Sequence, residues 1–350
     1  KLVNIIRIIL NPIVMIIMLL MGYRAIGMVV VTTAFNVVTL LINWWYCRNK
    51  LHIQVLFGQF HWGFFKEVSV YSFWIFLNAI MDRIYWSTGQ FVLGMFKGAA
   101  TVAVYAVAIQ LQSIYMGFST AISGVFLPKV TGMVTRNNSE KEISDLFIRT
   151  GRIQYIIMAF ILTGFIVFGK YFILLWAGPD YEQSYWIALC FFIPLTVPLI
   201  QNLGITILQA RNQMKFRSTV YVIIALASLL ISIPLAKRFG GIGCAIGTSI
   251  ALIAGQIIIM NIYYYRKIHI DIPSFWKEIG RMSVFPIVIG ILAAFCTSLF
   301  YPNSIGKLLV AIIIFSAIYL PLFGITSMNT YERNLIGTPV RRMVQRICKR

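Results

Sequence analysis

Residues 153–176 read IQYIIMAFILTGFIVFGKYFILLW, a run with one charged side chain, Lys170. A hydrocarbon core of about 30 Å is crossed by roughly 20 apolar residues in a helix. Similar runs fill most of the chain, in which 59% of the residues are hydrophobic and 11% are charged. The runs are continuous and do not alternate with polar residues. The sequence therefore predicts an all-α polytopic membrane protein with about ten transmembrane helices.

Basic residues follow the order of these runs. The runs lie at about 4–22, 25–47, 69–95, 100–126, 153–176, 184–208, 218–236, 242–264, 282–300 and 307–326. Of the 30 Lys and Arg residues, 22 lie before the first run, in every second gap, or in the tail. Cytoplasmic loops carry such an excess, so we expect both chain ends to be cytoplasmic. The net charge of +20 is then mostly a sign of this topology, with some attraction to anionic membrane lipids, and gives little support for a nucleic-acid partner.

The sequence shows no arrangement typical of a catalytic or metal site. Its five cysteines are scattered singly, without a CxxC pair, and resemble small buried apolar residues. Its three histidines lie in expected cytoplasmic loops, far from any Ser, Asp or Glu that could complete a nucleophile and base. We therefore expect no catalytic residues, no metal and no cofactor, and a protein that is not an enzyme.

A faint internal repeat relates two helical hairpins. A shift of 216 residues aligns Ile26 with Ile242 and Gly27 with Gly243, and chance similarity is the alternative explanation. Two lobes related by a repeat are a known transporter architecture. On this interpretation residues 1–66 are the last two helices of an incomplete first lobe with its linker, residues 67–265 are a six-helix second lobe, and residues 266–350 are two additional helices with a basic cytoplasmic tail. About 150 residues and four helices would be missing on the N-terminal side.

Asp82 alone among the ten acidic residues lies in the middle of an expected span, next to Arg83. A charge at the bilayer centre costs about 2.5–3.5 kcal/mol, so it must face protein or water. Asn78, Asp82, Trp86 and Gln90 are four residues apart, which places them in one stripe along a helix. We interpret this stripe as the lining of an aqueous path for a substrate or ion. The alternative is an Asp82 that pairs with a basic neighbour and only holds the lobe together.

Two further polar residues are candidates for this path. Gln110 lies on a face of small and polar residues in the run at 100–126, although small residues at this period usually indicate close helix packing. Arg7 lies near the start of the first run and either extends to the lipid headgroups or faces the path.

Two local patterns predict departures from simple straight spans. Pro194 and Pro198 should bend the sixth run and free backbone carbonyls, just before Gln201. Ser139 and Glu142 have the spacing of a capping box and precede an apolar helical face. This second pattern predicts an amphipathic helix along the inner membrane surface.

Several stretches resemble those of polysaccharide flippases, the Wzx-like branch of the multidrug, oligosaccharidyl-lipid and polysaccharide exporter superfamily. They are WAGPDY at 176–181, LQARNQMK at 208–215, GGIGCA at 240–245 and DRIYWSTG at 82–89. The last resembles the first helix of the family's second lobe. Each motif is short and degenerate, but the resemblance covers nearly the whole chain and matches the family's fifth to fourteenth helices.

The resemblance implies a transporter that flips an undecaprenyl-diphosphate-linked oligosaccharide across the bacterial inner membrane for surface polysaccharide such as O-antigen. Polysaccharide polymerase machinery is then a candidate partner. Arg83 and Arg7 would attract the diphosphate, and Asp82 would carry a coupling proton or sodium ion. The sugar hydroxyls would contact Asn78, Gln90 and Gln110.

Other functions stay open at this point. A multidrug or lipid II exporter of the same superfamily would share the fold and differ in the lining of its path. A membrane-embedded glycan polymerase or acyltransferase would usually present a large outer loop or a buried catalytic His, neither of which the expected topology contains. A purely structural membrane scaffold would leave Asp82 and the repeat unexplained.

Overall fold

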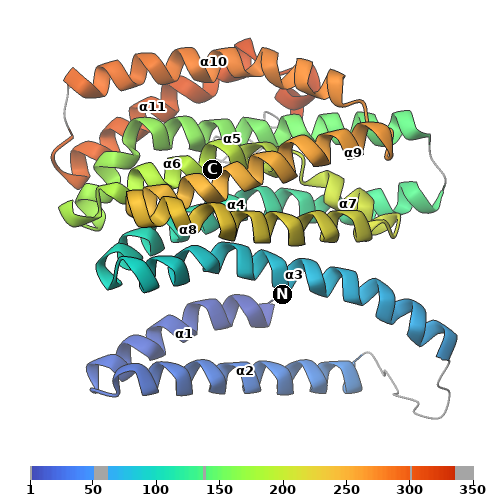
Figure 1. The fold of residues 1–350 in the computed structure, drawn as a ribbon, viewed down its shortest axis with the longest axis horizontal. Helices are drawn as coiled ribbons and strands as arrows, with labels where there is room; N and C mark the ends of the chain where they lie inside the picture. Colours follow the sequence, from blue (N-terminus) through green and yellow to red (C-terminus); the bar gives the residue numbers. More distant parts are fainter. Residues whose placement is uncertain (1, 51–61, 137–138, 300–301, 336–350) are drawn as a thin grey trace, which may run out of the picture. The chain divides into compact units, whose positions relative to one another are not determined.

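The structure is a computed structural model that describes residues 2–50, 62–136, 139–299 and 302–335. These residues are mostly helical and form no strand (Figure 1), which confirms the predicted all-α class. The main helices are α1 (Leu2–Leu20), α2 (Arg24–Asn49), α3 (Trp62–Phe96), α4 (Ala99–Thr135), α5 (Glu140–Trp176), α6 (Gln183–Ile200), α7 (Leu203–Ala210), α8 (Met214–Leu252), the π-helix η2 (Ile253–Ile259), α9 (Met260–Arg266), α10 (Ile272–Leu299) and α11 (Ile305–Thr326); a short 3₁₀ turn, η1 (Pro179–Tyr181), precedes α6. Most of the predicted basic tail, residues 336–350, lies outside the described residues.

The helices account for the ten predicted spans. Among the described residues, seven helical stretches are long and apolar enough to cross a membrane. One of them, Met214–Arg266, turns back at Gly240 and so supplies two of the predicted spans. The remaining two predicted spans are α1, whose apolar part is shorter, and α3, which carries Asp82 and Arg83. The protein is therefore a multi-pass membrane protein.

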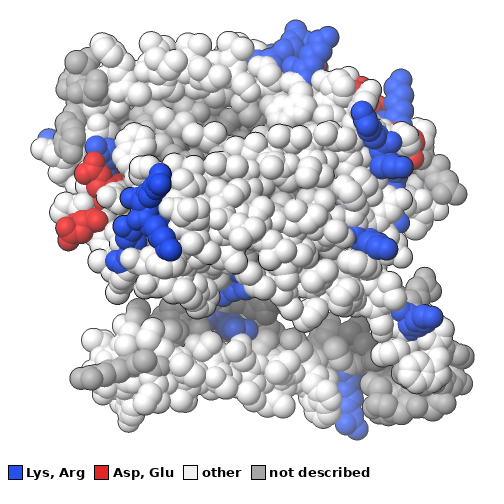
Figure 2. All heavy atoms as spheres, viewed as in Figure 1, with Lys and Arg blue, Asp and Glu red and all other residues white. Residues whose placement is uncertain are grey.

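The chain divides into two compact units, Lys1–Glu67 and Val68–Arg350. In the first unit, α1 and α2 pack together after a turn at Gly22, whose φ of +86° favours glycine. In the second unit, α5 packs against α4, α6, α10 and α11. Most charged side chains on the visible face of this second unit gather toward the ends of the helices and leave an uncharged band between them (Figure 2). Such a band suits the hydrocarbon layer of a membrane.

The helix predicted to bend is interrupted after its two prolines. Pro194 has no N–H to donate to the carbonyl of Cys190, and the Ser249 hydroxyl donates to that carbonyl instead at 2.6 Å. A turn at residues 201–202 then separates α6 from α7. Across this break the Gln201 side-chain amide donates to Asn261 Oδ1 at 2.8 Å. The carbonyl of Cys190 is thus freed as predicted, and Ser249 of the neighbouring helix α8 satisfies it.

The hairpin inside α8 depends on glycine. Gly240 makes the turn with φ +60° and ψ −136°. A Cβ at Gly243 would collide with the backbone carbonyl of Leu235, and one at Gly247 would collide with the backbone of Ser232. The two arms therefore approach each other backbone to backbone, as small residues allow in membrane helices.

Gly243→Ala is expected to destabilise the protein by about 1–3 kcal/mol, because the colliding carbonyl is part of the backbone and cannot rotate away. The measurement is thermal unfolding of the purified full-length protein in detergent. Gly117→Ala is the matched control, since nothing lies within 4 Å of a Cβ at that helical glycine. Equal unfolding temperatures for the two variants would contradict close backbone packing in the hairpin.

The segment predicted as an amphipathic surface helix is the first part of α5. Ser139 accepts a hydrogen bond from the Glu142 N–H at 3.3 Å, so the helix begins as predicted. Its apolar face is covered by protein, however, because Phe147 packs against Tyr264 and Phe275. The prediction that this helix lies along the membrane surface is wrong, because α9 and α10 cover its apolar face in place of lipid.

A charge cluster, formed by the buried Arg152 and Glu332 with the partly exposed Glu278, joins the C-terminal helices to the rest of the second unit. The Arg152 guanidinium donates to both carboxylate oxygens of Glu332, at 2.5 and 2.9 Å, and also to the Glu278 carboxylate. Glu332 accepts a further hydrogen bond from the Asn329 N–H at 3.0 Å. The cluster thus joins α5, α10 and the segment after α11. We call it the Arg152 cluster below.

Candidate functional site

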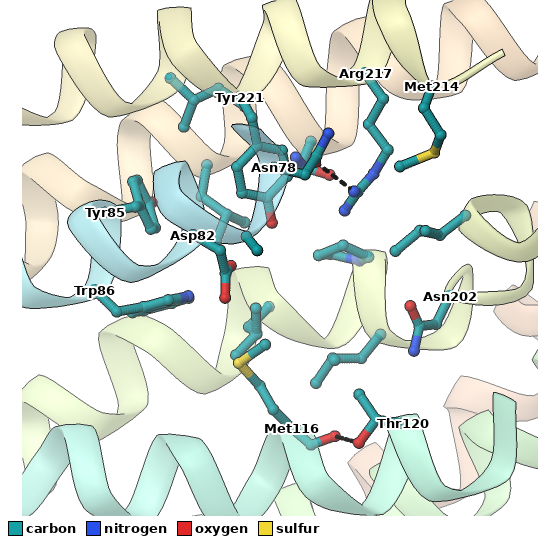
Figure 3. A pocket seen from close by; sticks show the side chains of 18 of the residues that line it. Asn78, Asp82, Tyr85, Trp86, Met116, Thr120, Asn202, Met214, Arg217 and Tyr221 are labelled. Atoms are coloured by element: carbon teal, nitrogen blue, oxygen red, sulfur yellow. Dashed lines mark hydrogen bonds between the residues drawn. The ribbon is translucent and has the colours of Figure 1, made fainter. Parts of the chain in front are cut away.

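A cavity of about 300 Å³, partly open to the outside, lies in the second unit between α3, α4, α6, α7, α8 and η2 (Figure 3). Apolar side chains from α3, α6 and α8 form much of its wall. Its polar or hydrogen-bonding lining residues are Asn78, Asp82, Tyr85, Trp86, Thr120, Asn202, Gln209, Arg217, Tyr221 and Gln256. Ionisable side chains inside a membrane bundle are costly and commonly mark an ion or substrate path.

Arg217, in the first turn of α8, extends into this cavity and is only 8% exposed. Its Nη1 donates to Asn78 Oδ1 at 2.8 Å, and its Cζ lies 4.7 Å from the centre of the Tyr221 ring. The Asn78 amide nitrogen donates in turn to the Ser218 hydroxyl. These contacts connect α3 with α8 and hold the guanidinium in one orientation.

Asp82 lies one turn beyond Asn78 on α3, and its carboxylate points into the cavity (Figure 3). It faces the indole of Trp86, the phenol of Tyr221 and, at longer range, the guanidinium of Arg217. Within the described part of the chain no salt bridge joins Asp82 to a basic residue. Asp82 and Arg217 therefore interact as opposite charges across the cavity, where the surrounding protein screens them less than water does.

Asp82 also lines a second space, a groove of about 390 Å³ between α3 and α4. Four residues line both spaces, namely Asp82, Trp86, Met116 and Thr120. They form the wall where the cavity and the groove adjoin. The groove further contains the polar side chains of Arg83, Ser87, Gln90, Gln112 and Ser113.

Comparison with known proteins identifies the family. The family described as "Polysaccharide biosynthesis protein" matches residues 1–186, more than half of the chain. The chain belongs to this family. A relative from Haloferax volcanii, "Probable low-salt glycan biosynthesis flippase Agl15", is 23% identical over 256 residues, which cover 71% of this chain and 52% of the relative. The chain thus spans about half the length of that relative. No solved structure matches it.

These findings confirm the resemblance to polysaccharide flippases that the sequence motifs indicated. In this polysaccharide biosynthesis protein, the predicted stripe on α3 lines the two spaces. Asn78 lines the cavity, Asp82 and Trp86 line both spaces, and Gln90 lines the groove. Arg83 is exposed and also lines the groove. The i, i+4 spacing was a sufficient signal for bringing these side chains together.

Two predicted residues lie elsewhere. Gln110 is exposed on α4 and lines neither space, whereas Gln112 is buried at the groove. The groove follows Ile109, Ser113 and Met116 along α4, so Gln110 stands beside its edge. Arg7 is half-buried on α1 in the first unit.

Sequence reasoning missed most of the other polar residues of the cavity in this polysaccharide biosynthesis protein, and Arg217 and Gln256 are the two most deeply buried of those from α8 and η2. Arg217 directly precedes the apolar run at 218–236, so the sequence pattern places it among the basic residues of a gap between runs, but its side chain turns into the cavity. Gln256 interrupts the apolar stretch of η2 and is 7% exposed. A lone amide within such a stretch was an available signal, and π-helical turns are frequent at functional sites.

Proposed function

We propose that the full-length protein containing this chain flips an undecaprenyl-diphosphate-linked oligosaccharide from the cytoplasmic to the outer face of a bacterial inner membrane. The product serves surface polysaccharide synthesis, and both ends of the chain lie in the cytoplasm. Family membership, the flippase name of the relative and the multi-pass fold support this proposal. The same observations favour a transporter over an enzyme.

The observation that carries the proposal is the polar groove between α3 and α4. A glycan and its diphosphate need a hydrated path, whereas a prenyl chain can stay in the lipid. In the groove, the exposed guanidinium of Arg83 can bind a diphosphate with two parallel hydrogen bonds. Gln90, which is partly exposed there, offers its amide group to sugar hydroxyls.

Asp82 is the candidate coupling group. It lies in the wall between the groove and the cavity, where uptake of a proton or sodium ion would change its interaction with Arg217. A ligand shifts a conformational equilibrium only when it interacts differently with the two states. A charge change at this wall gives the transporter such a difference as its lobes move.

The test is complementation. We expect the full-length gene to restore surface polysaccharide, and to clear accumulated lipid-linked repeat units, in a bacterial strain whose own flippase is deleted. The empty vector is the control. Drug resistance without restored glycan would instead indicate a multidrug exporter, and restored chain length without movement of precursor would indicate a polymerase.

Arg83→Gln is expected to lower export in this strain by about 10- to 100-fold, because a hydrogen bond to a charged group contributes about 1.5–3 kcal/mol. Arg83→Lys should keep part of the activity, since it retains the charge but not the paired geometry. Lys97→Gln is the control, as this lysine follows α3 outside the groove. Export is measured at equal membrane levels of each variant, and unchanged export in Arg83→Gln would remove Arg83 from the path.

A further inference from the structure

A third space, which we call the apolar groove, has a volume of about 380 Å³ and lies between α5, α10 and α11. Phe168 of α5 and Phe315 of α11 form its floor, because they are only 5% and 7% exposed and their ring centres lie 5.5 Å apart. Exposed apolar side chains border its open side, namely Leu292, Ile314 and Ile318. Its described lining residues carry no charge.

The apolar groove exists because α10 and α11 pack closely along only part of their length. At Phe285, α10 contacts the rings of Tyr319 and Phe323, with ring centres 5.4 and 5.6 Å apart. Toward the other end of α10, small residues such as Ala293 and Ala311 line the groove. Small residues in membrane helices normally let two helices approach closely. Here they leave a space, whose walls gain dispersion contacts only when an apolar chain fills it.

A cation lies at the end of the apolar groove. Lys307 is in the first turn of α11, and Ala311, Ile314 and Ile318 of the groove follow on the same helical face. Lys307 is exposed, and its Nζ donates to Asn303 Oδ1 at 2.9 Å. It forms no salt bridge with a described residue. A lysine at the end of a spanning helix lies near the lipid headgroups and attracts those that are anionic.

We propose that the apolar groove binds an acyl chain of an anionic phospholipid, such as phosphatidylglycerol, whose phosphate contacts Lys307. The apolar lining favours a hydrocarbon chain, and the cation at its end favours an anionic headgroup over a zwitterionic one. The bound chain fills the gap between α5, α10 and α11 and so stabilises their packing. No lining residue of this groove comes from α3 or α4, and the proposal does not depend on the flippase function.

Cys296 lines the apolar groove and is exposed, so its reactivity reports occupancy. The test measures how fast N-ethylmaleimide alkylates Cys296 in the purified full-length protein in detergent, with its other cysteines replaced by alanine. Phosphatidylglycerol should protect Cys296 and reach half its effect at about a fivefold lower mole fraction than phosphatidylcholine with the same chains, since one lysine near the headgroups contributes that difference. Glycerol phosphate, which has no chains, should not protect it.

Three outcomes would overturn the proposal. They are equal protection by the two phospholipids, protection by glycerol phosphate alone, and stronger protection by undecaprenyl phosphate than by phosphatidylglycerol, which would assign the apolar groove to a prenyl chain. If the cysteine-replaced protein fails to fold, native mass spectrometry of the unaltered protein decides. It should then show phosphatidylglycerol bound to the wild type and less of it bound to Lys307→Gln, and equal binding would contradict the site.

Variants locate the effect. Lys307→Gln should remove the preference for phosphatidylglycerol over phosphatidylcholine, whereas Lys97→Gln should keep it, because Lys97 follows α3 and does not line the apolar groove. The matched reporter is Val288→Cys combined with Cys296→Ala, since Val288 is exposed on α10 outside the apolar groove. Equal protection at the two reporter positions, or a preference that persists in Lys307→Gln, would show that the lipid binds elsewhere.

Discussion

Replacing Glu332 with Gln is expected to lower the free energy of unfolding by about 3–5 kcal/mol, the usual cost of breaking a buried ion pair from one side. Glu332 is 2% exposed, and its carboxylate accepts two hydrogen bonds from Arg152. The variant leaves that guanidinium buried with Glu278 as its remaining carboxylate. The loss should appear as earlier thermal unfolding of the purified full-length protein in detergent.

Glu182→Gln is the matched control for this prediction. Glu182 also forms a salt bridge, with Lys170, but the two side chains are 48% and 44% exposed. Exposed pairs contribute about 0–1 kcal/mol. A shift for Glu332→Gln as small as the shift for Glu182→Gln would show that the Arg152 cluster does not hold α10 and α11 in place.

Asp82→Asn and Arg217→Gln are each expected to reduce glycan export at least about tenfold in the flippase-deleted strain, at equal membrane levels. Each substitution leaves the other charge without its partner across the cavity, and a loss of about 1.4 kcal/mol in this interaction is enough for a tenfold effect. Surface polysaccharide should fall while lipid-linked precursor accumulates.

The double variant Asp82→Asn with Arg217→Gln separates folding from transport. If the two charges balance each other, their joint removal should restore membrane level relative to the single variants without restoring export. Arg211→Gln, at the same end of the bundle but outside the cavity, should export normally. Export by the double variant at the wild-type level would make the pair structural.

The sequence predicted the helices well because a bilayer imposes one strong rule on every span. Continuous apolar runs of sufficient length had to become helices, and Asp82 stood out because a charge in such a run is costly. The stripe from Asn78 to Gln90 followed from helical geometry alone. None of these inferences required knowledge of which helices are neighbours.

The missed features all depend on neighbours. Asn78 and Tyr221 set the direction of the Arg217 side chain. Asn78 is distant in the sequence, and the sequence does not determine how the nearby Tyr221 ring is oriented. The burial of Phe147 depends on Phe275 from α10. Gln110 and Gln112 are equally polar, and only the position of α4 beside α3 distinguishes the groove from its edge. The periodicity of a sequence does not predict contacts of this kind.

The central claim is that Asp82 and the groove beside it belong to a path for lipid-linked oligosaccharide. The most direct measurement reconstitutes the full-length protein in vesicles that carry this lipid, with a pH or sodium gradient, and follows sugar accessibility to a membrane-impermeant oxidant. The account predicts that sugars of the inner leaflet become accessible with the wild type and stay protected with Asp82→Asn. Equal accessibility for these two proteins, or no gain over protein-free vesicles with the wild type, would contradict it.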